Sequence, residues 1–408
     1  MTIPLSSCPP LRRLVATLPL CLLVAAAGCR RFAFPDVPAG YREFAYVSNG
    51  ASNTVTVLDL VYLRQDRTLR VGNNPSGMDV NQTKQEVYVT NAQSGSVSII
   101  DTAKNQVAAT IPVGRLPYSL SVEPSGLRAF VANSGSNSVS VIDLNQRRVV
   151  QVAGTGEQPG VARVAPDART LVVSNRGSGS VSIFNVAPDV GPGSGAPLSL
   201  RATFGGCPGA TDVAILPDSS KAFVACSGGH QVMAVGLAVL PGSWAARHDT
   251  SLLADHFLTF LDVGKTPVHL AMKPDGGEIF VSNYASDSIS EVSTSTNEVG
   301  GTYVIGNKPV HGIVSADNGT LWVSNFGADS VGIYSIDDGK LEGSVHTGSA
   351  PDVMAFSADE HLLLVADAHS GDVSVIRTQD KQGPALFTIL PAGGSPNDIV
   401  VKAMQGKQ

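Results

Sequence analysis

Three features of the 408-residue sequence predict an all-β fold built from eight copies of one repeat. A short text rich in Val, Ser and Asn recurs along the chain, and each copy reads as two short strands around a turn. None of the copies shows the 3.6-residue period of a helix. The 42 glycines and 25 prolines indicate a chain interrupted by many turns.

The marker position of the repeat is an asparagine that ends the first strand of each copy. It recurs every 42 residues through the first four copies, in texts such as AYVSNGASNTVTVLDL from Ala45 and VYVTNAQSGSVSIIDT from Val87. The marker positions are Asn49, Asn91, Asn133, Asn175, Cys226, Asn283, Asn325 and Asp367. Because Asn and Asp side chains in turns hydrogen-bond loop backbone, we interpret these positions as structural.

Each hairpin has a further strand on either side, so one period contains four strands. Residues 114–126 read as a strand that ends in a tight turn before a hairpin, and residues 106–114 as a short strand that follows one. Four strands in a period of about 40 to 45 residues are typical of a β-propeller blade. The copies therefore predict an eight-bladed β-propeller of four-stranded antiparallel blades. A seven-bladed ring, with a terminal copy outside it, is the alternative.

The two ends of the repeat region are complementary. The region begins near Phe44 with the second strand of a blade and ends with a lone first strand at 395–401. Pairing of this C-terminal strand with the N-terminal blade closes the ring through backbone hydrogen bonds and leaves no incomplete blade. We therefore expect one propeller domain over 44–402, followed by a tail at 403–408.

The repeat text also resembles a known family. The letters YVTN at Tyr88–Asn91, with variants YVSN at Tyr46 and FVSN at Phe280, resemble the YVTN-family β-propeller repeat over the whole repeat region. That family contains extracellular and periplasmic propellers and is similar in fold to propeller lactonases, quinoprotein dehydrogenase subunits and haem-binding nitrite reductases. The resemblance implies a secreted propeller and leaves its activity open, because a shared fold does not supply chemistry.

The N-terminal residues read as an export signal. Two arginines precede the apolar run 14–28, which is too short to span a bilayer comfortably, and small residues end this run before Cys29. The ending Ala-Ala-Gly-Cys resembles the lipobox of bacterial lipoproteins, which implies removal of 1–28 and acylation of Cys29. A short membrane tether at 29–43 then leads to the propeller. A plain signal peptide is the alternative.

These features predict a location outside the cytoplasm. A lipoprotein is attached to a bacterial membrane through its acyl chains alone. Arg30 stands where enteric-type lipoproteins retained at the inner membrane have Asp, which favours the outer membrane and a periplasmic or cell-surface position. Removal of 1–28 takes away two arginines and no acidic residue, so the formal charge changes from −6 to −8. This acidic surplus argues against nucleic acid as a partner.

Two cysteines remain after removal of the signal and acylation of Cys29. Cys207 lies in the loop that enters the fifth copy, and Cys226 replaces the marker asparagine of the same copy. Because an oxidising compartment favours pairing, we predict a Cys207–Cys226 disulfide in place of the missing asparagine. A zinc site that includes nearby His230 is the alternative, with fewer ligands than zinc requires.

Ligands of propellers commonly bind at the mouth of the axial channel, where the innermost strands begin. The residues two positions after each entry proline align as Gly77, Ser119, Val161, Ala210, His269, His311, Val353 and Asp398. His269 and His311, with Asp352, Asp398 and Ser119, form the candidate ligand or metal rim. This rim is suited to a transition metal, to acid/base chemistry or to axial ligation of a flat, haem-like cofactor. In the alternative interpretation, the two histidines reflect duplication of the repeat, and their imidazoles bond loop backbone. Apart from a metal or haem-like cofactor at His269 and His311, no cofactor is predicted.

Two insertions interrupt the regular spacing after the third strands of neighbouring blades, at 186–200 and 240–261. The second contains Trp244, Arg247 and His248 and is expected to hold one helical turn. We interpret it as a candidate partner loop on the face opposite the rim, because insertions on a rigid repeat often carry recognition. In the alternative interpretation, Trp244 plugs the lower end of the channel or caps a blade.

The sequence lacks the Gly-x-Ser-x-Gly, His-Glu-x-x-His and Cys-x-x-Cys-His texts of hydrolases, zinc proteases and covalent haem proteins. We therefore expect an extracytoplasmic, lipid-anchored monomer that acts as a binding or protein-interaction module of the cell envelope, with an envelope protein or a small ligand as partner. The alternative is a propeller enzyme that uses the histidine-lined channel mouth, either a lactonase-like hydrolase or a redox or cofactor-binding subunit.

Overall fold

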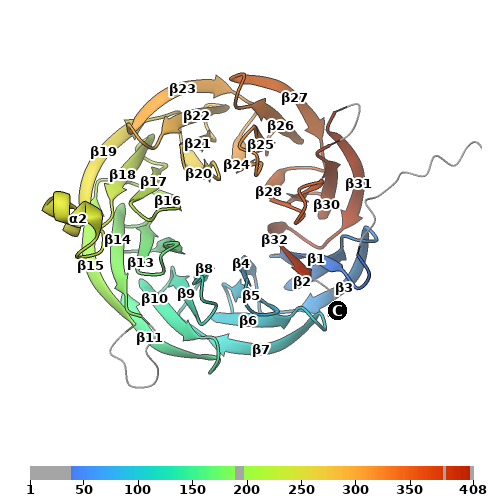
Figure 1. Cartoon of the computed structure of the whole chain (residues 1–408). Coiled ribbons are helices and arrows are strands. Elements are labelled where there is room, and N and C mark those ends of the chain that lie inside the picture. The colour runs from blue at the N-terminus through green and yellow to red at the C-terminus, as the bar shows by residue number, and fades with distance from the viewer. Residues whose placement is uncertain (1–37, 189–196, 380–382, 405–408) are drawn as a thin grey trace, which may run out of the picture. The chain divides into compact units, whose positions relative to one another are not determined.

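Four-stranded antiparallel sheets recur eight times around a ring in the computed structural model (Figure 1). The inner strands are β4 (Pro75–Asn81), β8 (Pro117–Val122), β12 (Pro159–Val164), β16 (Ala210–Ile215), β20 (Pro267–Met272), β24 (Pro309–Val314), β28 (Pro351–Phe356) and β32 (Pro396–Met404). The second strands are β1 (Arg42–Asn49), β5 (Glu86–Asn91), β9 (Arg128–Asn133), β13 (Thr170–Asn175), β17 (Lys221–Cys226), β21 (Glu278–Asn283), β25 (Thr320–Asn325) and β29 (Leu362–Asp367).

Two further strands complete each sheet toward the outside. The third strands are β2 (Thr54–Asp59), β6 (Ser96–Asp101), β10 (Ser138–Asp143), β14 (Ser180–Val186), β18 (Gln231–Gly236), β22 (Ser288–Ser293), β26 (Ser330–Ser335) and β30 (Asp372–Arg377). The outer strands are β3 (Arg64–Arg70), β7 (Gln106–Pro112), β11 (Arg148–Gly154), β15 (Leu198–Gly205), β19 (His256–Asp262), β23 (Glu298–Val304), β27 (Lys340–His346) and β31 (Ala385–Pro391).

The structure describes residues 38–188, 197–379 and 383–404. The ring belongs to the unit Arg42–Gln405, and a separate unit contains Met1–Tyr41 and Gly406–Gln408. The predicted signal peptide, the acylation site Cys29 and most of the tether lie outside the described residues. Among the residues that the structure describes, no helix is both long and apolar enough to cross a membrane.

The C-terminal strand closes the ring, as predicted. β32 lies antiparallel to β1, with Arg42 opposite Met404 and Ser48 opposite Asp398. The first sheet therefore has the order β3-β2-β1-β32, which confirms eight blades and excludes seven. The pairing extends two residues past the expected end of the domain at 402, because Met404 is buried between the first two blades.

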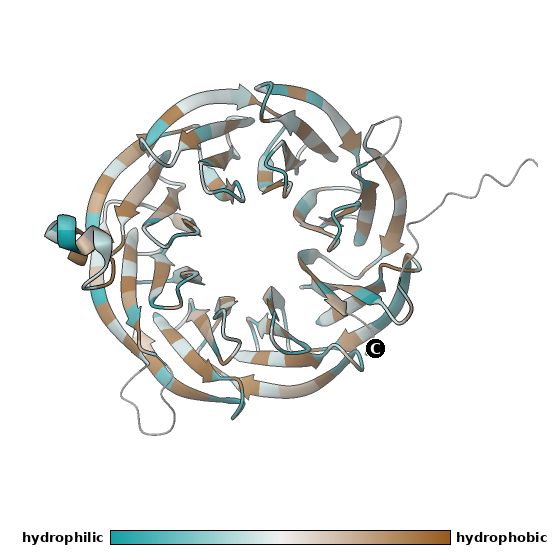
Figure 2. Ribbon diagram, in the orientation of Figure 1, coloured by the Kyte–Doolittle hydropathy of each residue, from teal (hydrophilic) through white to brown (hydrophobic). Residues whose placement is uncertain are grey.

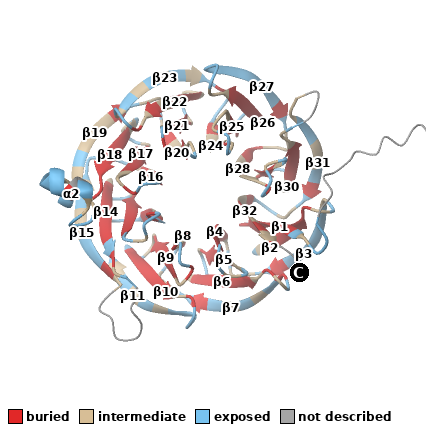
Figure 3. Ribbon diagram, in the orientation of Figure 1, coloured by how far each residue is buried: buried red, intermediate tan, exposed pale blue. Residues whose placement is uncertain are grey.

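The apolar core lies between neighbouring blades. In the contact between the first two blades, Tyr46 and Val57 pack with Val87 and Val89. The second and third strands are almost entirely buried, whereas the outer strands alternate or face solvent (Figure 3). Apolar residues are concentrated along the strands, including parts of the exposed outer strands (Figure 2). Each blade is therefore stabilised chiefly by its two neighbours.

The marker asparagines have a structural role, but their main partner differs from the predicted loop backbone. The side-chain amide of Asn175 donates to the hydroxyls of Ser180 and Ser182 in the third strand, at 3.1 and 2.9 Å. Asn49, Asn91, Asn133 and Asn283 make the same pair of bonds to Ser or Thr. The predicted bond to loop backbone occurs in two described blades, where Asn133 Oδ1 accepts the Gly114 N–H at 3.0 Å and the Asn325 amide donates to the Ile305 carbonyl at 3.4 Å.

The marker side chain also explains the glycine that stands in the entry loops of seven of the eight inner strands, Cys207 taking this position in the fifth blade. A Cβ at Gly114 would lie 2.5 Å from Cγ of Asn133. This is much closer than van der Waals contact, so a larger residue would displace the asparagine. The loop glycine and the marker asparagine therefore depend on each other.

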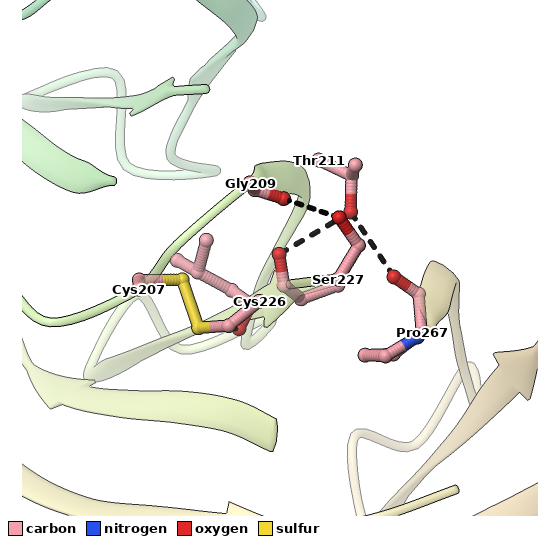
Figure 4. Close-up of a disulfide and its surroundings, with 8 residues drawn as sticks. Cys207, Gly209, Thr211, Cys226, Ser227 and Pro267 are labelled. Atoms are coloured by element: carbon pink, nitrogen blue, oxygen red, sulfur yellow. Dashed lines mark hydrogen bonds between the residues drawn. A yellow bond between two sulfur atoms is a disulfide. The ribbon is translucent and has the colours of Figure 1, made fainter. Parts of the chain in front are cut away.

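The fifth blade replaces this contact with the predicted disulfide. Cys207 and Cys226 are bonded, with their Cα atoms 4.8 Å apart, and both are fully buried (Figure 4). Beside the disulfide, the Ser227 hydroxyl donates to the Gly209 carbonyl at 2.9 Å. The bond holds the incoming loop to the end of the second strand, the same two segments that Gly114 and Asn133 join in the third blade.

Removal of a marker asparagine tests its structural role. We expect Asn175→Ala to lower the free energy of unfolding by about 1–3 kcal/mol, because two buried serine hydroxyls lose their partner. Urea unfolding measures this change. Asn145→Ala, on an exposed turn, is the matched control and should stay within about 0.5 kcal/mol of the parent protein. Equal effects of the two substitutions would contradict the assignment.

Removal of the disulfide should weaken the fold without opening the ring. We expect the double variant Cys207→Ala with Cys226→Ala to lose about 2–4 kcal/mol of unfolding free energy, because the unfolded chain is no longer cross-linked over 19 residues. Thermal unfolding with and without a reductant provides the measurement. A double variant as stable as the oxidised parent protein would contradict the expectation.

Candidate functional site

The candidate rim residues lie on the inner wall of the ring, near the start of each inner strand. In the fifth blade, Ala210 starts β16 opposite Cys226, so the residue two positions later is Asp212. The sequence alignment that placed Ala210 at this position is wrong, because the proline of this blade, Pro208, lies two residues before the inner strand, whereas the other inner strands begin with proline. The rim positions in blade order are Asp398, Gly77, Ser119, Val161, Asp212, His269, His311 and Val353.

Several inner-wall side chains bond the backbone of the next blade. Asp398 Oδ2 accepts the N–H of Met78 at 2.6 Å, and Asp212 Oδ2 accepts that of Leu270 at 3.0 Å. The same kind of inter-blade bond runs from Ala162 to Ser119, from Gly312 to His269, from Val122 to Asp79 and from Val164 to Ser121. These bonds cross five of the eight blade junctions. Much of the polar wall therefore serves the ring itself.

His269 and His311 are brought together, as the sequence predicted. Their rings lie 4.1 Å apart between centroids, at an interplanar angle of 37°. Burial lowers the pKa of His269 to about 3 and holds the pKa of His311 well below its usual range. Both imidazoles are therefore neutral at neutral pH.

The two imidazoles differ in what they bond. His269 Nδ1 accepts the Gly312 N–H at 3.2 Å, so the proton of the neutral ring is on Nε2, 3.7 Å from Oδ2 of Asp212. His311 Nδ1 is buried and has no hydrogen-bond partner among the described residues. His269 is thus part of the wall, whereas His311 retains an unused ring nitrogen.

Asp352 is the second inner-wall group with unused bonding capacity. It lies on β28, in the blade that follows His311, and no hydrogen bond joins its carboxyl to any residue within 38–188, 197–379 and 383–404. Burial raises the pKa of Asp352 to about 6. A carboxyl with this pKa exchanges protons readily near neutral pH.

Asp398 and Ser119 are engaged in the wall. Burial raises the pKa of Asp398 to about 7, and the nearby charges of Asp79 and Asp352 raise it further, against the N–H bonds it accepts. The Ser119 hydroxyl donates to the Gly160 carbonyl at 2.8 Å and accepts an inter-blade N–H. The predicted rim therefore separates into wall residues and two residues on neighbouring inner strands, His311 and Asp352, that retain unused bonding capacity.

Sequence reasoning missed the groups beyond the rim position. Asp212 escaped because the entry proline of its blade is displaced. Asp79 and Arg163 lie further along their strands, where no alignment of strand starts reaches them. The two-residue alternation of a strand would have predicted both residues, because Asp79 and Arg163 each lie two positions after a rim residue and therefore on the same side of the strand.

The candidate partner loop lies on the outside of the ring, beside β15 and β19 (Figure 1). It contains the expected helical turn, α2 (Trp244–His248), followed by a 3-10 turn over Thr250–Leu253. Trp244 is 70% exposed and stacks on His248 at 4.1 Å, so it does not plug the channel. A buried ion pair between Arg201 and Asp255, at 2.6 Å, attaches the end of the loop to the preceding blade. Arg247 lies within α2 and is exposed.

The residues present do not fit a cofactor iron or metal held by both imidazoles. His269 accepts a backbone N–H with one ring nitrogen and carries its proton on the other, so it offers no lone pair. No group of three or more His, Cys, Asp or Glu with metal-binding geometry occurs in the part of the chain that the structure describes. His311 alone retains an unused ring nitrogen.

In sequence, residues 310–392 match the profile of a family described as "Lactonase, 7-bladed beta-propeller". The matched segment contains both His311 and Asp352 and corresponds to the last two complete blades before the closing strand. Among curated proteins, none matches the chain.

Three solved structures illustrate the likeness in fold. The dihydro-heme d1 dehydrogenase NirN in complex with DHE has a TM-score of 0.71 at 14% identity, with 90% of this chain and 76% of that chain covered. A putative 6-phosphogluconolactonase from Bacteroides fragilis has a TM-score of 0.57 at 17% identity, with 78% of this chain and 98% of that chain covered. Hydrazine synthase from Kuenenia stuttgartiensis has a TM-score of 0.52 at 20% identity, with 82% of this chain and 92% of that chain covered. At these identities the likeness concerns the fold.

Titration of Asp398 should make the stability of the ring depend on pH. Its pKa is about 7 in the folded protein and about 4 in an unfolded chain, so its contribution to stability is complete below pH 4 and is lost as pH rises through 7. We therefore expect Asp398→Asn, relative to the parent protein, to become progressively more stable between pH 5 and pH 8. Urea midpoints at both pH values measure the difference. A difference that is independent of pH would contradict the raised pKa.

Proposed function

We propose that this protein is a lactonase-like hydrolase that opens a small lactone at the inner wall of its propeller. Asp352 acts as the general base, and neutral His311 donates a hydrogen bond to the substrate. The comparisons with known proteins support this enzyme reading more than the binding module expected first, because the matched family and one similar structure are named as lactonases. Neither comparison assigns the substrate.

One observation carries the proposal. His311 and Asp352 lie on neighbouring inner strands. The buried Nδ1 of His311 has no hydrogen-bond partner among the described residues, and the half-buried carboxyl of Asp352 forms no hydrogen bond with them either. Buried polar groups are normally bonded, and exceptions often mark functional sites. Both residues lie in the segment that matches the lactonase profile. Their lack of protein partners is therefore consistent with partners supplied by a substrate and a water molecule.

The chemistry needs only these groups and water. The Asp352 carboxylate accepts a proton from water as the water oxygen attacks the lactone carbonyl carbon. The bond between this carbon and the ring oxygen then breaks, and the proton passes to that oxygen to give a hydroxy acid. His311, neutral because of its burial, donates a hydrogen bond without bringing a full charge into the site. A base with a pKa of about 6 is largely ionised at neutral pH.

Cofactor binding is the second candidate function. It is favoured by the extent of the likeness to NirN, which covers 90% of this chain. The absorbance spectrum of natively purified protein distinguishes the two candidates, because a coloured cofactor would favour the redox reading. Since both nitrogens of His269 are committed, such a cofactor would have to use His311.

We further propose that the protein works outside the cytoplasm, as a monomer held to a bacterial membrane by a lipid on Cys29. The export signal and lipobox-like ending support this location. The buried Cys207–Cys226 disulfide agrees with an oxidising compartment. The exposed loop around Trp244 provides the surface for any envelope partner.

Lactone hydrolysis can be measured directly. We expect the full chain to hydrolyse at least one aldonolactone above its spontaneous rate in a pH-stat assay, with activity that rises as pH increases through about 6, because the base must be ionised. Asp352→Asn should lower kcat at least 100-fold, within the range of about 10²–10⁴ usual for general-base catalysis. His311→Ala should also lower it.

The controls separate catalysis from folding. Asp143→Asn changes a carboxylate that bonds only an outer turn, and it should leave kcat unchanged. Circular dichroism should show the same strand content in all variants. If no lactone is hydrolysed by the parent protein, or if Asp352→Asn retains full activity, the proposed function is wrong.

A further inference from the structure

A separate cavity of about 430 Å³ lies further along the inner strands than the rim, toward the turns that end them. Four neighbouring blades contribute to it, through β4, β8, β12 and β16. Its lining includes Asp79, Val80, Gln82, Ser121, Arg163 and Ile215. This volume is in the range of pockets that bind small molecules, and the lining combines apolar side chains with a few polar groups, as such pockets do.

Arg163 is the charged group of this cavity that lacks a close partner. Its side chain is half exposed, and its nearest carboxylate oxygen is Asp212 Oδ1 at 3.7 Å, which is beyond hydrogen-bond distance. Asp212 already accepts the N–H groups of Val213 and Leu270. Within the described parts of the chain, no residue accepts a hydrogen bond from the Arg163 guanidinium.

The carboxylates of the cavity are already engaged. Glu123 pairs with buried Arg128 at 2.7 Å, so its charge is balanced within the wall. Asp79 accepts two backbone N–H groups, from Val80 and Val122, both at 2.7 Å. Arg163 therefore faces the cavity with five N–H donors, a planar arrangement that matches carboxylate and phosphate.

The position of Arg163 in the ring agrees with a role toward a ligand. Among the described residues, no strand N–H of β16 bonds a side chain of β12, because Val161 and Arg163 stand where the preceding inner strand has the acceptors Ser119 and Ser121. The two blades are joined instead by the bond from the Asp167 N–H to the Ser219 hydroxyl at 3.1 Å and by the ion pair of Arg163 with Asp212 at 3.7 Å. Arg163 thus makes one long ionic contact with the wall, and its N–H donors have no hydrogen-bond acceptor among the described residues.

We propose that this cavity binds a small organic oxyanion. The guanidinium of Arg163 holds the carboxylate or phosphate group, and the body of the molecule packs against Val80, Val164 and Ile215. Hydroxyl groups on the ligand find acceptors and donors in Asp79, Ser121 and Gln82. The inference does not rest on lactone hydrolysis, because it concerns binding at a different part of the wall.

Calorimetric titration of the full chain tests the proposal with four probes. Gluconate carries a carboxylate, glucose 6-phosphate a phosphate, glucose neither, and inorganic phosphate has no organic body. We expect gluconate or glucose 6-phosphate to bind at least 10-fold more tightly than both glucose and inorganic phosphate, and the tighter of the two identifies the anionic group. Binding of glucose or of inorganic phosphate as tightly as either organic anion would overturn the proposal.

Substitutions locate the site. Arg163→Gln should weaken binding of the preferred anion at least 10-fold. Arg163→Lys keeps the charge but loses the planar arrangement of donors, so its affinity should lie between those of the parent protein and Arg163→Gln. Arg148→Gln, on an exposed outer strand, is the matched control and should bind like the parent protein. Because Arg163 is half exposed and loosely paired, the variants are expected to keep the parent melting temperature.

Unchanged affinity in a folded Arg163→Gln protein would also overturn the proposal. Anion binding without lactone hydrolysis would leave this inference intact and reject only the proposed function.

Discussion

The inner wall of the ring depends on hydrogen bonds that run from the backbone of one blade to a side chain of the blade before it. Polar groups this close to the axis would lose their hydration on folding, and each needs a partner to offset that cost. Asp398, Asp79, Asp212 and His269 find that partner in an N–H of the following inner strand. The wall can therefore be polar without weakening the ring.

The same constraint separates structural from functional side chains. A carboxyl or imidazole that accepts an inter-blade N–H has a defined orientation and little capacity left for a ligand. The side chains of His311, Asp352 and Arg163 make none of these inter-blade bonds, and no described residue forms a hydrogen bond with the His311 Nδ1, the Asp352 carboxyl or the Arg163 guanidinium. Two of them belong to successive blades, and the third lines a cavity. The proposed chemistry and the proposed anion site therefore follow from one comparison of bonded and unbonded wall groups.

The repeat made the fold predictable, whereas the site was only partly predictable. Eight in-phase copies with complementary ends were sufficient to predict the blade number, the ring closure and the disulfide that replaces Asn at Cys226. The pairing of His269 with His311 followed from their common repeat position. The alignment failed at Asp212, because Pro208 lies within the entry loop and not at the first residue of the inner strand, as the prolines of the other blades do. The alignment also could not predict that Asp398 accepts the Met78 N–H whereas Asp352 forms no such bond, because that difference depends on distances between neighbouring blades.

Hydrogen exchange of backbone amides on the inner strands tests the central claim most directly. The account predicts that the N–H groups of Met78, Val122, Leu270 and Gly312, which bond side chains of the preceding blade, exchange as slowly as the ladder amides of the same strands. It further predicts that Asp398→Asn leaves Met78 protected, whereas Asp398→Ala exposes it. Fast exchange of these amides in the parent protein, or protection of Met78 that survives Asp398→Ala, would contradict the account.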